Sequence, residues 1–193
     1  YKFAKSAKIP VINGLTNDSH PCQVLTDIFT FQELRGKISE KTVVWFGVAN
    51  NVFNSFLHAA IQFNFRIIFC GPEKFKPEKK VLDLKSSRKQ GFFEIEPDPI
   101  KAVKSADLIV TDKWVSMHDK PLNEKDLEEL MRFQINKTLV DKGKTEVLFM
   151  HCLPAAKGLE VTDEMFKDKR SVVFEEAEIR MHLQKSILRW CLK

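Results

Sequence analysis

The chain has 193 residues, of which 44% are hydrophobic and 30% charged, and its formal net charge is +5. This composition is typical of a folded globular protein and excludes an intrinsically disordered chain. Basic and acidic residues are interspersed, as in KPEKK at 76–80, so the charge pattern gives little support to a nucleic-acid partner. A mildly basic chain can still attract anionic substrates.

The four cysteines are widely separated, at Cys22, Cys70, Cys152 and Cys191. None forms a C-x-x-C pair, so we expect no metal and the reduced thiols of a cytoplasmic protein. No apolar run approaches the roughly 20 residues that cross a bilayer. No signal peptide is visible, and we expect no membrane partner. The chain begins at Tyr1, and residues 1–8 resemble the end of an earlier helix, so we expect a longer protein.

Short apolar runs alternate with longer amphipathic stretches along the whole chain. In chain order, the predicted elements are helix 21–33, strand 42–48, helix 51–64, strand 66–70, helix 78–89, strand 91–95, helix 98–105, strand 107–111, helix 123–133, strands 147–150 and 171–174, and helix 175–192. This alternation predicts an α/β fold with a doubly wound, mainly parallel, Rossmann-like sheet and helices on both faces.

The residues that follow each strand deserve most weight, because ligands bind beyond the carboxyl ends of parallel strands. Strand 42–48 is followed by Asn50 and Asn51, and only Gly47 is present where a dinucleotide-binding turn needs G-x-G-x-x-G. NAD binding is therefore not expected. An asparagine at this point either caps the next helix or orients a zwitterionic substrate through its amide.

Two further clusters follow the next strands of the predicted sheet. Asp112 follows strand 107–111 and precedes Ser116 and Met117. Its carboxylate either forms a turn or pairs with a substrate ammonium group. Strand 147–150 is followed by the segment 151–154, which reads HCLP. A lone cysteine such as Cys152 is usually a small buried apolar residue, but this one lies at a strand end.

A fourth cluster opens the first long helix, where His20, Pro21, Cys22 and Gln23 are consecutive. His20 and Gln23 are three residues apart, so both can face one spot near the helix N-terminus, which favours an anion. Each residue alone has an ordinary structural explanation. Together, the four clusters predict one binding site at one edge of the sheet.

These clusters resemble the motifs of the ornithine carbamoyltransferase family. The family motifs H-P-x-Q, D-x-W-x-S-M, H-C-L-P and E-A-E-x-R appear in that order at 20–23, 112–117, 151–154 and 176–180. The resemblance covers nearly all 193 residues. H-P-x-Q alone is shared with aspartate carbamoyltransferases, whereas the S-M and H-C-L-P elements indicate ornithine.

The resemblance implies transfer of the carbamoyl group from carbamoyl phosphate to the δ-amine of L-ornithine, which gives citrulline and phosphate. It implies no metal or organic cofactor, a homotrimer and a role in arginine biosynthesis. It also implies three regions: residues 1–20 as the tail of a carbamoyl-phosphate domain, 21–175 as the ornithine-binding domain and 176–193 as a closing helix.

Residue roles follow from the same resemblance. The implied catalytic residues are Cys152, Asp112 and Arg180. The implied ornithine-binding residues are Asn51, Asp112, Ser116 and Met117. The implied carbamoyl-phosphate residues are His20, Pro21, Cys22, Gln23, Cys152, Leu153 and Arg180.

The chain also departs from the family pattern. The phosphate-binding S-T-R-T-R sequence does not occur in these 193 residues, so we expect little activity from them alone. Val48, His118 and Ile179 stand where the family usually has Asp, Gly and Asn. Two alternatives therefore stay open: a non-catalytic ligand-binding paralogue, and a carbamoyltransferase for another amine such as putrescine or acetylornithine.

Overall fold

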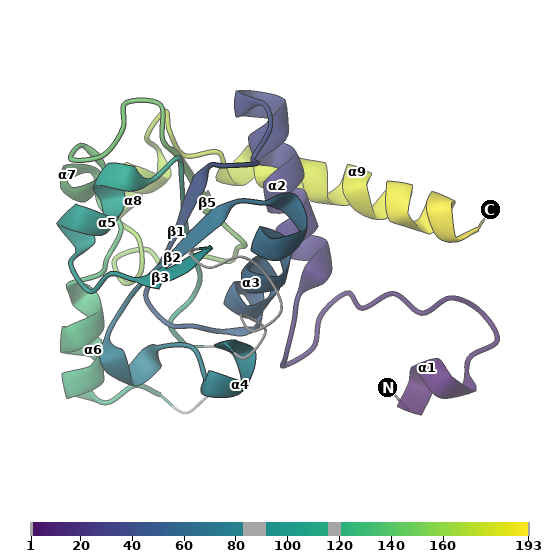
Figure 1. Cartoon of the computed structure of the whole chain (residues 1–193). Helices are drawn as coiled ribbons and strands as arrows, with labels where there is room; N and C mark the ends of the chain where they lie inside the picture. The colour runs from purple at the N-terminus through teal and green to yellow at the C-terminus, as the bar shows by residue number, and fades with distance from the viewer. Residues whose placement is uncertain (1, 83–91, 116–120, 193) are drawn as a thin grey trace.

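The centre of the computed structural model, which describes residues 2–82, 92–115 and 121–192, is a five-stranded parallel sheet (Figure 1). Its strands are β1 (Thr42–Phe46), β2 (Arg66–Cys70), β3 (Phe93–Ile95), β4 (Leu108–Thr111) and β5 (Leu148–His151). They lie in the order β3-β2-β1-β4-β5, and all four neighbouring pairs are parallel. The predicted doubly wound α/β architecture is confirmed.

Helices cover both faces of this sheet. In chain order they are α1 (Lys2–Ser6), α2 (Pro21–Arg35), α3 (Asn51–Phe63), the 3-10 turn η1 (Glu73–Phe75), α4 (Lys79–Leu82), α5 (Pro99–Ser105), α6 (Glu124–Met131), α7 (Lys137–Val140), α8 (Asp163–Phe166) and α9 (Val173–Cys191). Helices α2 and α3 pack on one face, with α9 against α2, and α5, α7 and α8 pack on the other. Helix α1 and the irregular segment after it lie away from the sheet (Figure 1).

Each face of the sheet has its own hydrophobic core. On the α2 and α3 side, Trp45 contacts Phe53 and Phe56 at ring-centroid distances of 5.7 and 6.0 Å. On the other side, Phe46 and Phe149 pack among apolar residues of α5, α7 and α8. Every residue of β1 is buried, as expected for a central parallel strand covered on both faces. Burial of each large side chain stabilises the fold by about 1.5–3 kcal/mol.

The prediction of a sixth strand at 171–174 is wrong. Ser171 forms only an isolated bridge with Phe149, and α9 already begins at Val173. The run is β-branched and apolar, which is typical of a strand. However, Val173 is buried against the sheet while Phe174 is 66% exposed. The closing helix therefore begins at Val173 rather than at the predicted residue 175. Of the predicted helix 78–89, α4 is described, and residues 83–89 lie outside the described ranges.

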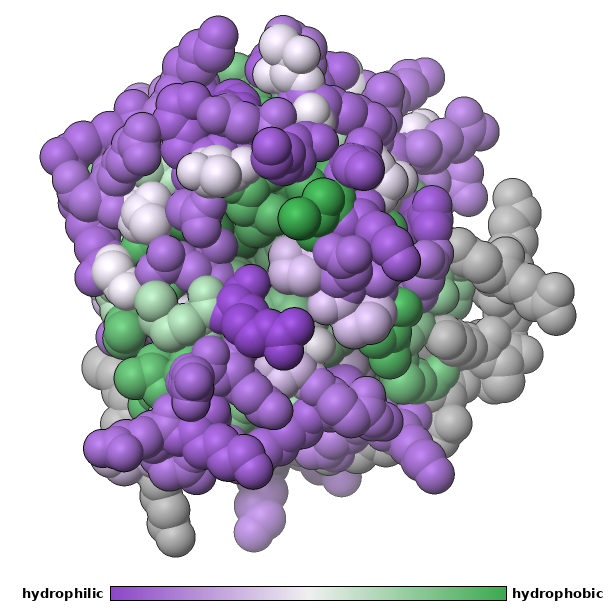
Figure 2. Space-filling model, turned by 90° about the vertical axis from the view of Figure 1, so that its left-hand side faces the viewer, coloured by the Kyte–Doolittle hydropathy of each residue, from purple (hydrophilic) through white to green (hydrophobic). Residues whose placement is uncertain are grey.

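The face of the molecule that carries α5, α6, α7 and α8 is mainly hydrophilic, and small patches of hydrophobic residues lie between the hydrophilic side chains (Figure 2). Helix α9 extends well beyond the body of the domain (Figure 1). Within the described ranges, none of the helices combines the length and apolarity needed to cross a bilayer.

Candidate functional site at the switch point of the sheet

The chain leaves the sheet in opposite directions from β1 and β4, which are neighbours. Such a switch point is the usual ligand-binding place in an open parallel sheet. Asn50 follows β1, Asp112 follows β4 and Cys152 follows β5, so the topology brings three of the predicted clusters to one edge.

Asn50 connects the first two of these strand ends. Its Oδ1 accepts hydrogen bonds from the backbone N–H groups of Val52 (3.0 Å) and Phe53 (3.1 Å), so it caps α3. Its Nδ2 donates to Asp112 Oδ2 at 2.6 Å. The capping role and the site role, which the sequence left as alternatives, therefore coexist in one side chain. The resemblance implied Asn51 instead, whose Nδ2 donates to the carbonyl oxygen of Thr16 at 2.7 Å.

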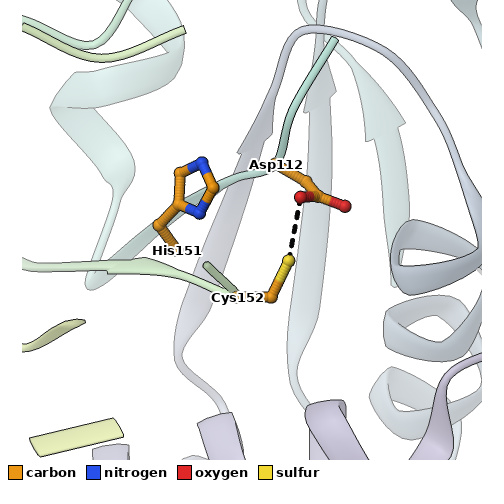
Figure 3. Close-up of side chains that lie close together, drawn as sticks. All are labelled: Asp112, His151 and Cys152. Atoms are coloured by element: carbon orange, nitrogen blue, oxygen red, sulfur yellow. Dashed lines mark hydrogen bonds between the residues drawn. The ribbon is translucent and has the colours of Figure 1, made fainter. Parts of the chain in front are cut away.

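Cys152 and Asp112 point toward one another (Figure 3). The thiol Sγ donates to Asp112 Oδ1 at 2.9 Å, and that oxygen also accepts from the backbone N–H of Lys113 at 2.7 Å. Burial, followed by the negative charge of Asp112, raises the pKa of the Cys152 thiol well above its ordinary value. Cys152 is therefore a neutral thiol at neutral pH, and Asp112 is the charged acceptor beside it.

Asp112, His151 and Cys152 each offer one possible metal-ligand atom, and these three atoms lie within 4.8 Å of one another. Both ring nitrogens of His151 are engaged: Nδ1 accepts from the Leu153 N–H at 3.0 Å, and Nε2 lies 3.1 Å from Glu160 Oε1. His151 and Glu160 are fully buried. A metal would have to displace one of these buried hydrogen bonds, so this cluster does not fit a resident ion.

A second group of side chains surrounds Arg180 on α9. Its Nη1 donates to Gln23 Oε1 at 2.8 Å, and its Nη2 lies 3.3 Å from His20 Nε2. Burial and the positive charge of Arg180 lower the pKa of His20, so its ring is neutral and Nε2 acts as the acceptor. Gln23, Cys152, Leu153 and Arg180 line one pocket, so this group faces the same space as the thiol.

The other predicted residues are placed as follows. Pro21 is the first residue of α2, and Cys22 is buried with its thiol 3.5 Å from the carbonyl oxygen of Asn13. Leu153 has a positive φ of 49° and precedes a cis proline. Ser116, Met117 and the departure at His118 lie outside the described residues.

Sequence reasoning missed two buried carboxyl groups, Asp27 and Glu176, that contact Gln23. Glu176 is the first residue of the E-A-E-x-R motif at 176–180, and the resemblance implies a role only for Arg180 in that motif. Asp27 lies four residues after Gln23, on the same face of α2. The four-residue spacing on a predicted helix could have indicated the contact between Gln23 and Asp27.

The geometry and the order of the clusters agree with a comparison to known families. Residues 39–191 match the Asp/Orn binding domain of aspartate/ornithine carbamoyltransferase, and residues 1–33 match its carbamoyl-P binding domain. The chain belongs to the aspartate/ornithine carbamoyltransferase family. The resemblance drawn from the motifs is confirmed.

Individual relatives of this family are similar along nearly the whole chain. An ornithine carbamoyltransferase of Paracoccus denitrificans is 50% identical over 193 residues, which is 99% of this chain and 62% of that protein. The solved ornithine carbamoyltransferase of Burkholderia thailandensis is 38% identical, with a TM-score of 0.87, and the match covers 99% of this chain and 61% of that chain. The enzyme of Pyrococcus furiosus is 42% identical, with a TM-score of 0.86 and coverage of 96% and 60%. The chain spans about three fifths of the length of these relatives.

Proposed function

We propose that this chain is the ornithine-binding part of an ornithine carbamoyltransferase, which transfers the carbamoyl group of carbamoyl phosphate to the δ-amine of L-ornithine. The observation that carries the proposal is the hydrogen bond from Cys152 to Asp112 at the switch point of the sheet. Cys152 and Arg180 line the same pocket, which supports the assignment of Cys152 and Asp112 to proton transfer there. The names and structures of the relatives support ornithine as the amine.

On the amine side, we assign substrate ammonium binding to Asp112. Its carboxylate is oriented by Asn50, Lys113 N–H and the Cys152 thiol, and it carries the negative charge that an ammonium group needs. Asn51, Ser116 and Met117 complete the amino-acid site in this proposal. On the carbamoyl side, Arg180 polarises the carbonyl oxygen and stabilises the charge that grows on it in the tetrahedral transition state.

Cys152 then serves as a proton relay. A free δ-amine with a pKa near 10 is mostly protonated at neutral pH and must lose a proton before it attacks. The Cys152 sulfur accepts that proton while its own S–H proton passes to Asp112 Oδ1. The freed lone pair forms the new C–N bond, the bond between the carbamoyl carbon and the phosphate oxygen breaks, and the second proton lost from the attacking nitrogen passes to the departing phosphate. Citrulline and phosphate are the products.

The test is citrulline formation by the chain joined to the part of the Paracoccus denitrificans relative that it does not cover. Cys152→Ala should lower kcat about a hundredfold or more, the usual effect of a proton-transfer group. The matched control is Cys191→Ala at the end of α9, which should stay near the parent value. Full activity in Cys152→Ala would contradict the relay. No citrulline from the parent would favour the non-catalytic paralogue, and preference for putrescine would favour the other amine.

The proposal extends to organisation and location. Residues 1–20 would end the carbamoyl-phosphate domain, 21–175 would form the ornithine-binding domain and 176–193 would close the structure; the family match over residues 39–191 supports the ornithine-binding part. Without S-T-R-T-R, the 193 residues alone should give little citrulline. We also propose a homotrimer for the complete enzyme. The four free cysteines support a reducing, cytoplasmic location.

A further inference from the structure

Asp27 on α2 and Glu176 on α9 form a buried pair of carboxyl groups behind the site. Their exposed fractions are 1% and 2%, and the two groups are hydrogen-bonded to each other. Two adjacent ionised carboxylates are very unfavourable without water, so the pair retains one proton. The reaction proposed above does not use this pair.

The amide of Gln23 lies between the pair and Arg180. Its Nε2 donates to Asp27 Oδ1 at 2.7 Å and to Glu176 Oε1 at 2.7 Å. Both amide hydrogens are thereby used, and the amide oxygen faces Arg180 and accepts from Nη1 at 2.8 Å. A flipped amide would place its NH₂ group against the guanidinium, where two donors repel. The carboxyl pair therefore determines which way the Gln23 amide points.

The surroundings of the pair indicate which member is neutral. Glu176 Oε2 accepts from the His151 N–H at 3.1 Å, and Oε1 accepts from Gln23 Nε2 at 2.7 Å. Burial and the charge of Asp27 raise the pKa of Glu176 well above its ordinary value. The hydrogen bonds from Gln23 and Glu176 act in the opposite sense on Asp27 and favour its ionised form.

The charged and titratable groups around the pair come from three elements. Arg180 on α9 is the facing cation, Asp112 after β4 is a facing anion, and the Cys152 thiol follows β5. One negative charge on the pair balances Arg180. A second would compete with the substrate for that guanidinium, because the low local dielectric strengthens the attraction.

We propose that Asp27 and Glu176 are positioning residues that share one proton and, through the Gln23 amide, hold Arg180 in the orientation that binds the carbamoyl group. Binding of the carbamoyl group by Arg180 rests on the proposed function, whereas the shared proton does not. The inference uses no other part of the proposed reaction.

The kinetic test uses the same fusion with the Paracoccus denitrificans relative. Glu176→Gln keeps a neutral donor to Asp27 and should stay within about threefold of the parent in kcat and in KM for carbamoyl phosphate. Glu176→Ala should raise that KM about tenfold or more and leave the KM for ornithine within about threefold, because it releases Arg180. Glu175→Gln, an exposed neighbour on α9, is the matched control.

A second variant keeps the proposal testable if Glu176→Ala fails to fold. The double change Asp27→Asn with Glu176→Gln keeps the shapes but removes the remaining charge, and should raise the KM for carbamoyl phosphate about tenfold while Glu176→Gln alone does not. In the parent, kcat/KM for carbamoyl phosphate should fall at alkaline pH, where Glu176 loses its proton. This fall should disappear in Glu176→Gln. Equal damage in Glu176→Gln and Glu176→Ala, or an unchanged double variant, would overturn the proposal.

A readout without activity separates this inference from the proposed function. In the 193-residue chain with ¹³C-labelled glutamate carboxyl groups, one glutamate resonance should keep the shift of a protonated acid at neutral pH and be missing in Glu176→Gln. Its absence from the parent would overturn the shared proton even if citrulline is formed. Its presence would support the pair even if no citrulline is formed.

Discussion

Cys152 illustrates how one neighbour changes the chemistry of a residue. A buried thiol is usually inert, and burial is the first cause of its raised pKa. The second cause is the carboxylate of Asp112, which accepts the thiol proton at 2.9 Å. A neutral thiol hydrogen-bonded to a carboxylate suits the proposed proton transfer better than attack as a thiolate nucleophile.

Asp112→Asn removes the charge that disfavours the thiolate. We predict that the pKa of Cys152 falls toward its ordinary value in this variant, although burial keeps it raised. Alkylation of Cys152 by iodoacetamide, followed by mass spectrometry across a pH series, measures this, and the rate should rise at a lower pH than in the parent. Alkylation of Cys191 in the same samples is the internal control. An unchanged profile at Cys152 would show that Asp112 does not act on the thiol.

At the scale of elements, the turn after β1 depends on Gly47. Its φ is +97°, a conformation that other residues rarely adopt, and a Cβ there would lie 2.5 Å from Trp114 Nε1. Trp114 is the third residue after β4, so the close approach of Gly47 and Trp114 joins the turns after β1 and β4. Those two turns carry Asn50 and Asp112.

Gly47→Ala should therefore weaken the fold at the site. We expect the free energy of unfolding to fall by about 1–3 kcal/mol, from the strained φ and the contact with Trp114. Urea unfolding monitored by tryptophan fluorescence measures the change. Gly14→Ala is the control, because nothing lies within 4 Å of a Cβ there and its φ is not positive. Equal stability of the two variants would contradict the requirement for glycine at position 47.

At the scale of the whole molecule, buried acids make stability depend on pH. Burial, opposed by hydrogen bonds from Gln23 and Glu176, raises the pKa of Asp27 from 3.8 to about 7, and Glu176 is raised as well. Between the unfolded and folded values, the folded state binds more protons than the unfolded state. The free energy of unfolding must therefore fall as pH rises through this window. Asp168, whose pKa Arg170 lowers to about 2, acts in the opposite sense, but its contribution is complete above pH 3.8. His20, whose pKa is lowered from 6.5, also acts in the opposite sense, and it offsets one of the two carboxyl groups at most.

We predict that the 193-residue chain loses stability from about pH 4 to 7, with a slope of up to about 1.4 kcal/mol per pH unit for each extra proton held. Glu176→Gln should remove the part due to Glu176 and flatten the curve. Urea unfolding at each pH measures both proteins, and Glu175→Gln serves as the matched control. Parallel curves for the parent and Glu176→Gln would contradict a raised pKa at Glu176.

Local patterns were sufficient for much of this molecule. The apolar run at 66–70 became β2 with the predicted bounds, and the alternation of strands and helices was enough for the doubly wound sheet. The strand ends also identified the segments that carry Asp112 and Cys152, whose side chains are hydrogen-bonded to each other. These features depend on short-range periodicity and on the rule that parallel strands end at one edge.

Only the tertiary structure decided the rest, because it depends on contacts between distant segments. The run at 171–174 has strand-like composition, yet Val173 packs into the core from the first turn of α9. Asn50 and Asn51 are indistinguishable by sequence pattern, and the register of α3 decides which amide reaches Asp112. Glu176 meets Gln23 across 153 positions of the chain. The motif clusters thus indicated where the candidate site lies, and the packing of α2 against α9 brought Gln23 together with Glu176 and Arg180.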